Sequence, residues 1–322
     1  MGLPKIVTHP LASIRTQGDS TPGSHGWHCP EGVQSARALL HIAPFVVRHP
    51  WADEPAFKLE ALGAVMERAS KRPSDYYYDA GDIKVTDSWG SRESPGLSPK
   101  QILDNIETAG VWCIMKHVEQ DAPYDRLLNE WAAFVRALAG PLGGRRLLRP
   151  EMLVLVTSPG RTTPFHFDAE VNFLVQLRGT KEVWVCNPLD RLVTTEAELE
   201  KYYAVTSTAG VYSELAKQRG QRFVLGPGDA LHIPTHAAHW VHNYDNVSVS
   251  LSMNFELPWL AHRARYQGNH MLRELGFQPP PVGRNVLRDQ LTGVTMGSAF
   301  RAQRLVRAQV KNVAKRLKAI RD

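Results

Sequence analysis

The sequence contains 322 residues, is 43% apolar and carries a formal net charge of +6, enough for one large domain or two modest ones. No run approaches the ~18 apolar residues of a membrane span, and residues 1–27 hold no apolar stretch of the secretory type. The cysteines Cys29, Cys113 and Cys186 are odd in number and far apart, so we expect a reduced, cytoplasmic protein.

The first part of the chain predicts an irregular arm followed by helices. Residues 1–30 are rich in Gly, Pro, Ser and Thr without periodicity. Residues 31–150 are dominated by helical patterns, such as the apolar stripe of "FKLEALGAVMERASK" and the longer "YDRLLNEWAAFVRALAG", which Gly140 is placed to end. We expect these helices to pack on the domain that follows.

From Glu151 the pattern changes to short strands separated by Gly or Pro turns. The closely spaced strands of residues 151–256 predict a mainly β core, a double-stranded β-helix (jelly roll) rather than a βαβ fold. The charged, partly helical segment 189–220 interrupts this series of strands, and we interpret it as an insertion between two of them. Helical sequence returns in residues 257–322.

The basicity of the chain is a property of its C-terminal tail. Residues 298–322 hold eight basic residues against Asp322 alone, so the remainder is close to neutral. Apolar residues recur in this tail at heptad-like spacing: Val306, Val310, Val313, Leu317 and Ile320. We expect a helix that packs on a second subunit, giving a homodimer, or on its own chain. Nucleic-acid binding by the basic face is the less favoured alternative.

The stretch "TTPFHFDAEVNFLVQLRGTK" places His166 and Asp168 two residues apart. On a strand such residues share a face, so both point into the barrel while Phe167 turns outward. A buried ionised Asp is costly unless it is paired or bound to a metal. Two His and one carboxylate on a metal leave open positions, the arrangement of non-haem Fe(II) oxygenases. A second His is then required.

The later stretch "LGPGDALHIPTHAAHWVHN" supplies candidates for that second His. It contains His232, His236, His239 and His242 within eleven residues. Composition alone does not choose among them.

Lys181 follows a turn that looks like a two-residue hairpin, Arg178-Gly179-Thr180-Lys181. Lys181 shares its strand face with Val183 and Val185. If that face points inward, a buried ammonium group needs an anionic partner. A dicarboxylate cosubstrate that chelates iron at one end could meet Lys181 at the other.

Taken together, these motifs resemble the JmjC/cupin-like Fe(II)- and 2-oxoglutarate-dependent oxygenases, and within them the branch of the asparaginyl hydroxylase of hypoxia-inducible factor. The likeness rests on "TPFHFDAEVNFLVQLRGTKEVWVCNP", "GPGDALHIPTHAAHWVHN" and "SVSLSMNF". It covers roughly residues 151–256, about a third of the chain.

This resemblance implies Fe(II), 2-oxoglutarate and O2 as cofactor and cosubstrates. It implies His166, Asp168 and His239 as the metal ligands. It also implies residues that bind 2-oxoglutarate: Lys181 and Thr163 at the far carboxylate, Asn172 and Asn254 near the chelating end.

The sequence departs from the family at two points. Ala237 and Ala238 stand where family members commonly have aromatic residues, which we expect to open space beside the metal. No motif places a tyrosine partner for the far carboxylate, although "DYYYD" at 75–79 is a candidate.

The implied activity is a hydroxylase that produces succinate and CO2. Its substrate would be a protein or peptide side chain or a small metabolite, and hydroxylation of an N-methyl group would cause demethylation. The alternative is a non-catalytic or regulatory cupin-like metal-binding protein whose basic tail binds nucleic acid or dimerises.

Overall fold

The computed structural model describes the chain in segments, with two compact units. One unit lies within residues 1–194 and 211–258, the other within 195–210 and 259–322. The described residues are 25–88, 90, 96–140, 147–256, 263–296, 298–300 and 302. None of the helices in these segments is both long and apolar enough to cross a membrane.

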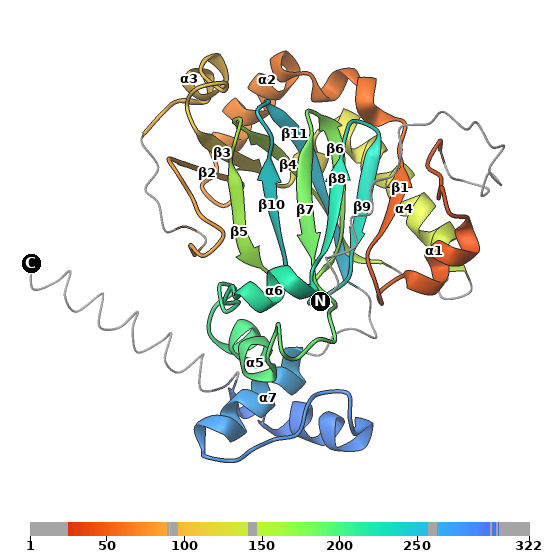
Figure 1. Cartoon of the computed structure of the whole chain (residues 1–322), viewed down its shortest axis with the longest axis vertical. Helices are drawn as coiled ribbons and strands as arrows, with labels where there is room; N and C mark the ends of the chain where they lie inside the picture. The colour runs from red at the N-terminus through yellow and green to blue at the C-terminus, as the bar shows by residue number, and fades with distance from the viewer. Residues whose placement is uncertain are drawn as a thin grey trace, which may run out of the picture. The chain divides into compact units, whose positions relative to one another are not determined.

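The first unit is built on two antiparallel sheets (Figure 1). The larger sheet runs in the order β1 (Phe45–Arg48), β9 (Asp229–Ile233), β6 (Val171–Arg178), β11 (Ser248–Glu256), β4 (Leu148–Thr157), β3 (Val111–Met115) and β2 (Tyr76–Ala80). The smaller sheet runs in the order β5 (Thr162–His166), β10 (His239–Asn243), β7 (Lys181–Val185) and β8 (Gln221–Leu225).

Successive strands from β4 to β11 pass between the two sheets, apart from the adjacent pair β7 and β8. This is the double-stranded β-helix that the sequence predicts. The inner faces of the sheets meet in an apolar cluster that includes Leu174, Val183 and Ile233. Removing such side chains from water is the main force that holds the sheets together.

The larger sheet is covered on its outer face by the helix α4 (Ala122–Ala139). Trp131 and Phe134 of this helix contact Phe173 of β6 edge-to-face, with ring centroids 5.9 Å and 6.5 Å away. All but the last residue of β6 are buried, since one face looks into the barrel and the other onto α4. Aromatic pairs of this kind contribute about 0.5–1.5 kcal/mol beyond the area they bury.

The helical patterns of the sequence correspond to α2 (Leu59–Ser70), α3 (Pro99–Asp104) and α4, preceded by α1 (Val33–Leu39). A capping box begins α3: Ser98 accepts from the backbone N–H of Gln101, whose side chain accepts from the N–H of Ser98. Single-turn helices complete this part of the unit: η1 (Trp51–Asp53), η2 (Pro55–Phe57) and η3 (Val118–Gln120).

Residues 31–150 also contribute three strands that the helical interpretation misses: β1, β2 and β3. Each has four or five residues, and β3 is buried throughout, so it shows no polar–apolar alternation. A short apolar run of this kind cannot be assigned by periodicity. Its place is set by pairing with β4.

The turn at Gly179 differs from the predicted hairpin. β6 pairs with β9 and β11 in the larger sheet, whereas β7 pairs with β8 and β10 in the smaller one. The turn therefore joins two sheets. Gly179 has φ +74°, as expected for a glycine in a tight turn. The residues of a turn determine that the chain changes direction, but they do not determine which strands pair.

The second unit contains α5 (Glu196–Ala204), α7 (Arg263–Glu274) and a helical segment at 286–296. Tyr203 of α5 stacks on Tyr266 of α7 at 5.0 Å. The fully buried carboxylate of Glu200 accepts two hydrogen bonds from Arg273, at 2.7 and 3.0 Å. Part of the predicted insertion thus packs with C-terminal helices, while its remaining helix, α6 (Glu214–Arg219), belongs to the first unit. The heptad-like tail from Val306 lies outside the described residues.

We predict that Gly179→Ala destabilises the first unit by at least about 3 kcal/mol, because overpacking adds to the cost of a left-handed backbone. An added Cβ would lie 2.5 Å from the carbonyl oxygen of Val247 and would also collide with Asn246. Gly160→Ala is the matched control, since Gly160 has φ +68° but no neighbour within 4 Å of an added Cβ. Urea unfolding of both variants measures the difference, and equal losses would contradict the steric argument.

Candidate metal centre

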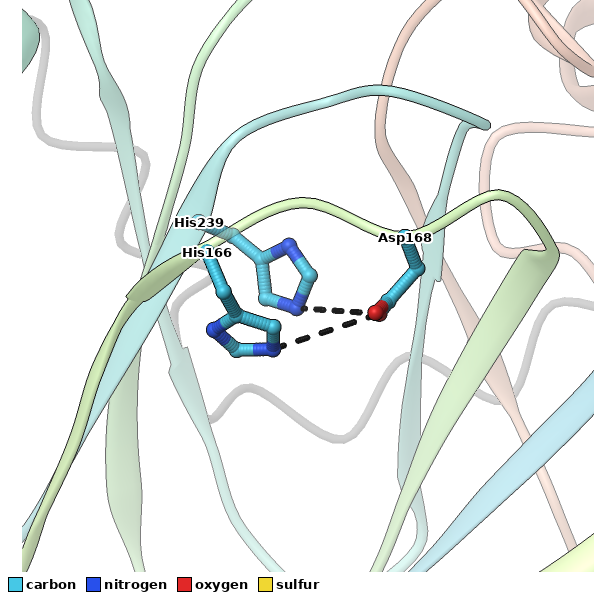
Figure 2. Close-up of side chains that lie close together, drawn as sticks. All are labelled: His166, Asp168 and His239. Atoms are coloured by element: carbon cyan, nitrogen blue, oxygen red, sulfur yellow. Dashed lines mark ion pairs between the residues drawn. The ribbon is translucent and has the colours of Figure 1, made fainter. Parts of the chain in front are cut away.

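Three potential metal ligands meet where β5 ends and β10 begins (Figure 2). His166, the last residue of β5, lies directly opposite His239, the first of β10. Asp168 follows on the segment that leads to β6. Its Oδ2 atom lies 3.9 Å from His166 Nε2 and 3.8 Å from His239 Nε2. One ligand atom from each residue lies within 4.8 Å of the other two.

Both imidazoles present the same nitrogen to Asp168. His166 Nδ1 lies 2.7 Å from the carbonyl oxygen of Pro164, and His239 Nδ1 lies 2.9 Å from that of Ala237. A carbonyl oxygen only accepts, so each Nδ1 carries the proton and donates. Each Nε2 is then left with a lone pair directed at the shared space, the orientation that a metal ligand requires.

The electrostatics of the three groups suit a cation. Burial lowers the pKa of His166 and of His239 to about 4, so both rings are neutral at pH 7. Burial raises the pKa of Asp168, opposed by His239. Two neutral nitrogens and a poorly solvated carboxylate fit a divalent transition metal, whose charge would replace the hydration that Asp168 has lost.

The route by which Asp168 reaches His166 differs from the predicted one. The sequence argument places both residues on one strand, but β5 ends at His166 and the chain bends at 169–170 before β6. The backbone N–H of His236 donates to the carbonyl oxygen of Asp168 at 2.9 Å, which links this segment to the loop before β10. Phe167, predicted to turn outward, is buried.

The other histidines of the second motif lie in different surroundings. His232 is buried on β9, stacks on Phe45 and has its Nδ1 atom 3.2 Å from the carbonyl oxygen of Ala43. His242 Nδ1 lies 3.2 Å from the Thr162 hydroxyl. Among the described residues, one group of three His, Cys, Asp or Glu side chains has the spacing of metal ligands. From this motif the group includes only His239.

The triad borders a cavity of about 280 Å³ inside the barrel. The predicted cosubstrate residues Lys181, Thr163, Asn172 and Asn254 all line it. Other side chains in its wall come from both sheets: Trp112, Ile114, Lys116, Glu151, Leu153, Leu155, Thr157, Glu170, Leu174, Ile233, Val241, Asn243 and Ser252.

Lys181 lies at the opposite end of this cavity from the triad. Lys181 pairs with Asn243 across β7 and β10, and four residues further along these strands Val185 pairs with His239. The two pairs are therefore about 13 Å apart along the strands. Only 3% of Lys181 is exposed, and no acidic partner contacts it among the described residues. Burial lowers the pKa of its ammonium group to about 7.

A row of polar residues crosses the larger sheet at the triad end. Asn172, Asn254 and Glu151 lie opposite one another on β6, β11 and β4. The Nδ2 atom of Asn172 donates to Ser252 Oγ at 2.6 Å, and that hydroxyl donates to Asn254 Oδ1 at 3.1 Å. These bonds join the three side chains in one polar row.

Sequence reasoning missed Glu151, Glu170, Lys116 and Trp112 as cavity residues. Glu170 and Asn172 continue the alternation that begins at Asp168, so spacing from Asp168 could have identified Glu170. Trp112 belongs to β3 and Lys116 directly follows it, and the periodicity of the sequence does not reveal this strand.

Two further expectations differ from the structure. Tyr76, Tyr77 and Tyr78 stand on β2 at the edge of the larger sheet, and none of them lines the cavity. Ala237 and Ala238 are fully buried outside the cavity wall, and Ala237 packs in the apolar cluster between the sheets. Their small size therefore does not widen the space beside the triad.

Comparison with known proteins identifies the fold of the first unit. Residues 114–258 match the model of the cupin-like domain. The first unit has a cupin-like fold. A zebrafish (Danio rerio) protein described as tRNA wybutosine-synthesizing protein 5 is 34% identical over 90 residues. That match covers 27% of this chain and 27% of the relative, so it spans about a quarter of the relative's length.

Solved structures similar to this chain include YcfD of Escherichia coli, described as a ribosomal oxygenase. Its complex with cobalt and 2-oxoglutarate matches with a TM-score of 0.46, and its complex with cobalt and succinic acid with 0.44. Each is 16% identical and covers 84% of this chain and 66% of YcfD.

We predict that His239→Ala weakens binding of Co(II) to the cupin-like unit at least about 100-fold, because one of the three donors is lost. The visible absorption of bound Co(II) measures the affinity. His242→Ala is the matched control, since this histidine lies three residues away and bonds to Thr162. Equal losses in the two variants would place the metal elsewhere.

Proposed function

We propose that the cupin-like unit is an Fe(II)- and 2-oxoglutarate-dependent oxygenase. The supporting observation is a two-His, one-carboxylate set at one end of a cavity, with a buried lysine at the other end that no acidic side chain among the described residues contacts. In the proposed reaction 2-oxoglutarate, O2 and a substrate C–H bond give succinate, CO2 and an alcohol. One oxygen atom of O2 enters succinate and the other enters the alcohol.

His166, Asp168 and His239 would hold the metal. When bound, Fe(II) supplies the redox chemistry that activates O2, and three protein donors leave positions for 2-oxoglutarate and O2. The protein's task is to keep both Nε2 atoms unprotonated, which the bonds from each Nδ1 to a backbone carbonyl achieve. No protein general base is needed.

Lys181 would bind the far carboxylate of 2-oxoglutarate. About 13 Å of strand separates its position from that of His239. A lysine side chain of about 6 Å, a hydrogen-bond contact of about 3 Å and a five-carbon diacid of about 6 Å together are long enough to span that distance. Thr163 lies on β5, opposite Val241 of β10, and lines the cavity, where its hydroxyl would be a further donor.

The apolar part of the cavity wall would keep water from the reacting groups. Ile114, Leu155 and Val241 line the same cavity as Lys181 and the triad. A charge pair between Lys181 and a carboxylate is strengthened there because the surroundings screen it poorly. The same wall restricts how 2-oxoglutarate can lie.

The substrate is a protein or peptide side chain or a small metabolite, and attack at an N-methyl group would make the same chemistry a demethylation. The finer resemblance to the asparaginyl hydroxylase branch stays a prediction from sequence. So do the homodimer and the cytoplasmic location.

We predict that anaerobic addition of Fe(II) and 2-oxoglutarate to metal-free protein produces a visible metal-to-ligand charge-transfer band. Lys181→Ala should weaken 2-oxoglutarate binding on the order of 100-fold, because the far carboxylate loses the buried cation that would pair with it. Lys116→Ala, a second lysine of the same cavity wall, is the control and should change the affinity much less.

Two results would contradict the proposal. Metal binding without the band would leave a cupin-like metal-binding protein of another function. A band whose 2-oxoglutarate dependence is the same in Lys181→Ala and in the unchanged protein would remove Lys181 from the site.

We predict that 2-oxoglutarate binding weakens as pH rises above about 7. The pKa of Lys181 is lowered to about 7 by burial, so above that pH the empty site holds a neutral amine and must take up a proton to pair with the carboxylate. The dissociation constant should rise about tenfold per pH unit above 7 and level off below it. Titrations of the charge-transfer band between pH 6.0 and 8.5 measure this. Lys181→Arg, which stays charged, should abolish the dependence.

A further inference from the structure

Lys181 lies in surroundings that favour its uncharged amine while 2-oxoglutarate is absent. On the two neighbouring strands it pairs with Asn243 of β10 and Leu225 of β8, and neither of these residues carries a charge. Burial lowers the pKa of Lys181 to about 7, so about half of the empty sites hold a neutral amine at pH 7. A desolvated lysine amine of this kind is a nucleophile.

The cavity beside this amine suits a small, uncharged electrophile. Lys181 borders a space of about 280 Å³, to whose wall Leu155, Leu174 and Val241 contribute apolar side chains. Apolar surroundings admit an uncharged molecule more readily than an ion. Carbon dioxide is an electrophile of this class, and the reaction proposed above releases it in the same cavity.

A neutral amine and CO2 combine without any further reactant. The nitrogen lone pair forms a bond to the carbon of CO2, one C=O electron pair moves onto oxygen, and the nitrogen gives one proton to water. The lysine amine and CO2 thus become a carbamate anion and a proton, with no change of oxidation state. An ammonium group has no lone pair to donate, so solvated lysines, with pKa values near 10.4, react far less at neutral pH.

Two features of the cavity favour the carbamate once it forms. The hydroxyl groups of Thr157 and Thr163, two residues that line the cavity, can donate to an anion there. A divalent metal at the triad would bring two positive charges against the one negative charge of Asp168. In a cavity that screens charges poorly, this excess stabilises a further anion.

We propose that CO2 reversibly carbamylates Lys181 while 2-oxoglutarate is absent, and that the carbamate excludes 2-oxoglutarate from the cavity. The carbamylation depends only on the lysine and its cavity, whereas the competition with 2-oxoglutarate rests on the proposed oxygenase function. The exclusion follows because an anion replaces the cation that would pair with the far carboxylate. A product of the proposed reaction would then inhibit binding of its cosubstrate.

The first measurement locates the carbamate on the unchanged protein. Metal-free protein is equilibrated with bicarbonate at about pH 8, where most of the Lys181 amine is neutral. Triethyloxonium then converts carbamates into stable ethyl esters, and mass spectrometry of the peptides identifies the modified residues. We expect the ester on Lys181. Lys116 is the matched control in the same cavity wall, and it should stay unmodified because the carboxylate of Glu151 lies near its ammonium group.

The second measurement tests the competition with 2-oxoglutarate. The charge-transfer band of anaerobic Fe(II) protein is titrated with 2-oxoglutarate in bicarbonate and in chloride of equal ionic strength. If about two-thirds of the protein carries the carbamate, the apparent dissociation constant should rise about threefold in bicarbonate. Lys116→Arg should respond in the same way. Lys181→Arg should show no rise, because a guanidinium group stays protonated and forms no carbamate.

Each other outcome counts against a defined part of the proposal. No ester on Lys181 at saturating bicarbonate would overturn the carbamylation, whether or not the band forms. An ester on Lys181 without any change in 2-oxoglutarate affinity would overturn the competition. An equal rise in Lys181→Arg would assign the effect to bicarbonate on the metal. Absence of the band from every sample would instead refute the oxygenase function, and the peptide analysis would still decide whether Lys181 is carbamylated.

Discussion

The cupin-like unit places two opposite charges in one cavity without pairing them with each other. Asp168 stands at the triad end and Lys181 at the other, and burial acts on both. It raises the pKa of Asp168 and lowers the pKa of Lys181 to about 7, so each group is driven toward its neutral form. A cation at the first and an anion at the second would reverse both effects. Ligand binding and folding stability are therefore coupled through the same two side chains.

The alternation of strands between the sheets is what separates these charges. His166 and His239 become neighbours because β5 pairs with β10, although 73 residues separate them in sequence. Lys181 enters the smaller sheet only because the turn at Gly179 carries the chain across from β6. The crowding of Gly179 against Val247 and Asn246 leaves no room for a side chain at that crossing. The distance between metal end and lysine end is thus a property of the topology rather than of any one loop.

The sequence predicted the fold class because its strongest signals are local. Closely spaced strands with Gly and Pro turns specify an antiparallel β core, and long apolar stripes specify helices such as α4. The same local reasoning failed for β3, whose five buried residues have no alternation, and for the Gly179 turn, whose strands pair with other partners. Strand pairing depends on segments that lie far apart in the chain, and the periodicity of one segment does not reveal its partner.

The site shows the same division. His166, Asp168 and Lys181 could be singled out because a charged group beside an apolar strand needs a ligand, whereas the choice of His239 among four histidines required the family resemblance. Glu151 and Lys116 escaped notice, because an acid or a lysine near a strand end is usually solvated. Their relevance appears only when β3, β4 and β6 are seen to share one inner face. Glu151 lies in the row with Asn172 and Asn254 at the triad end of the cavity.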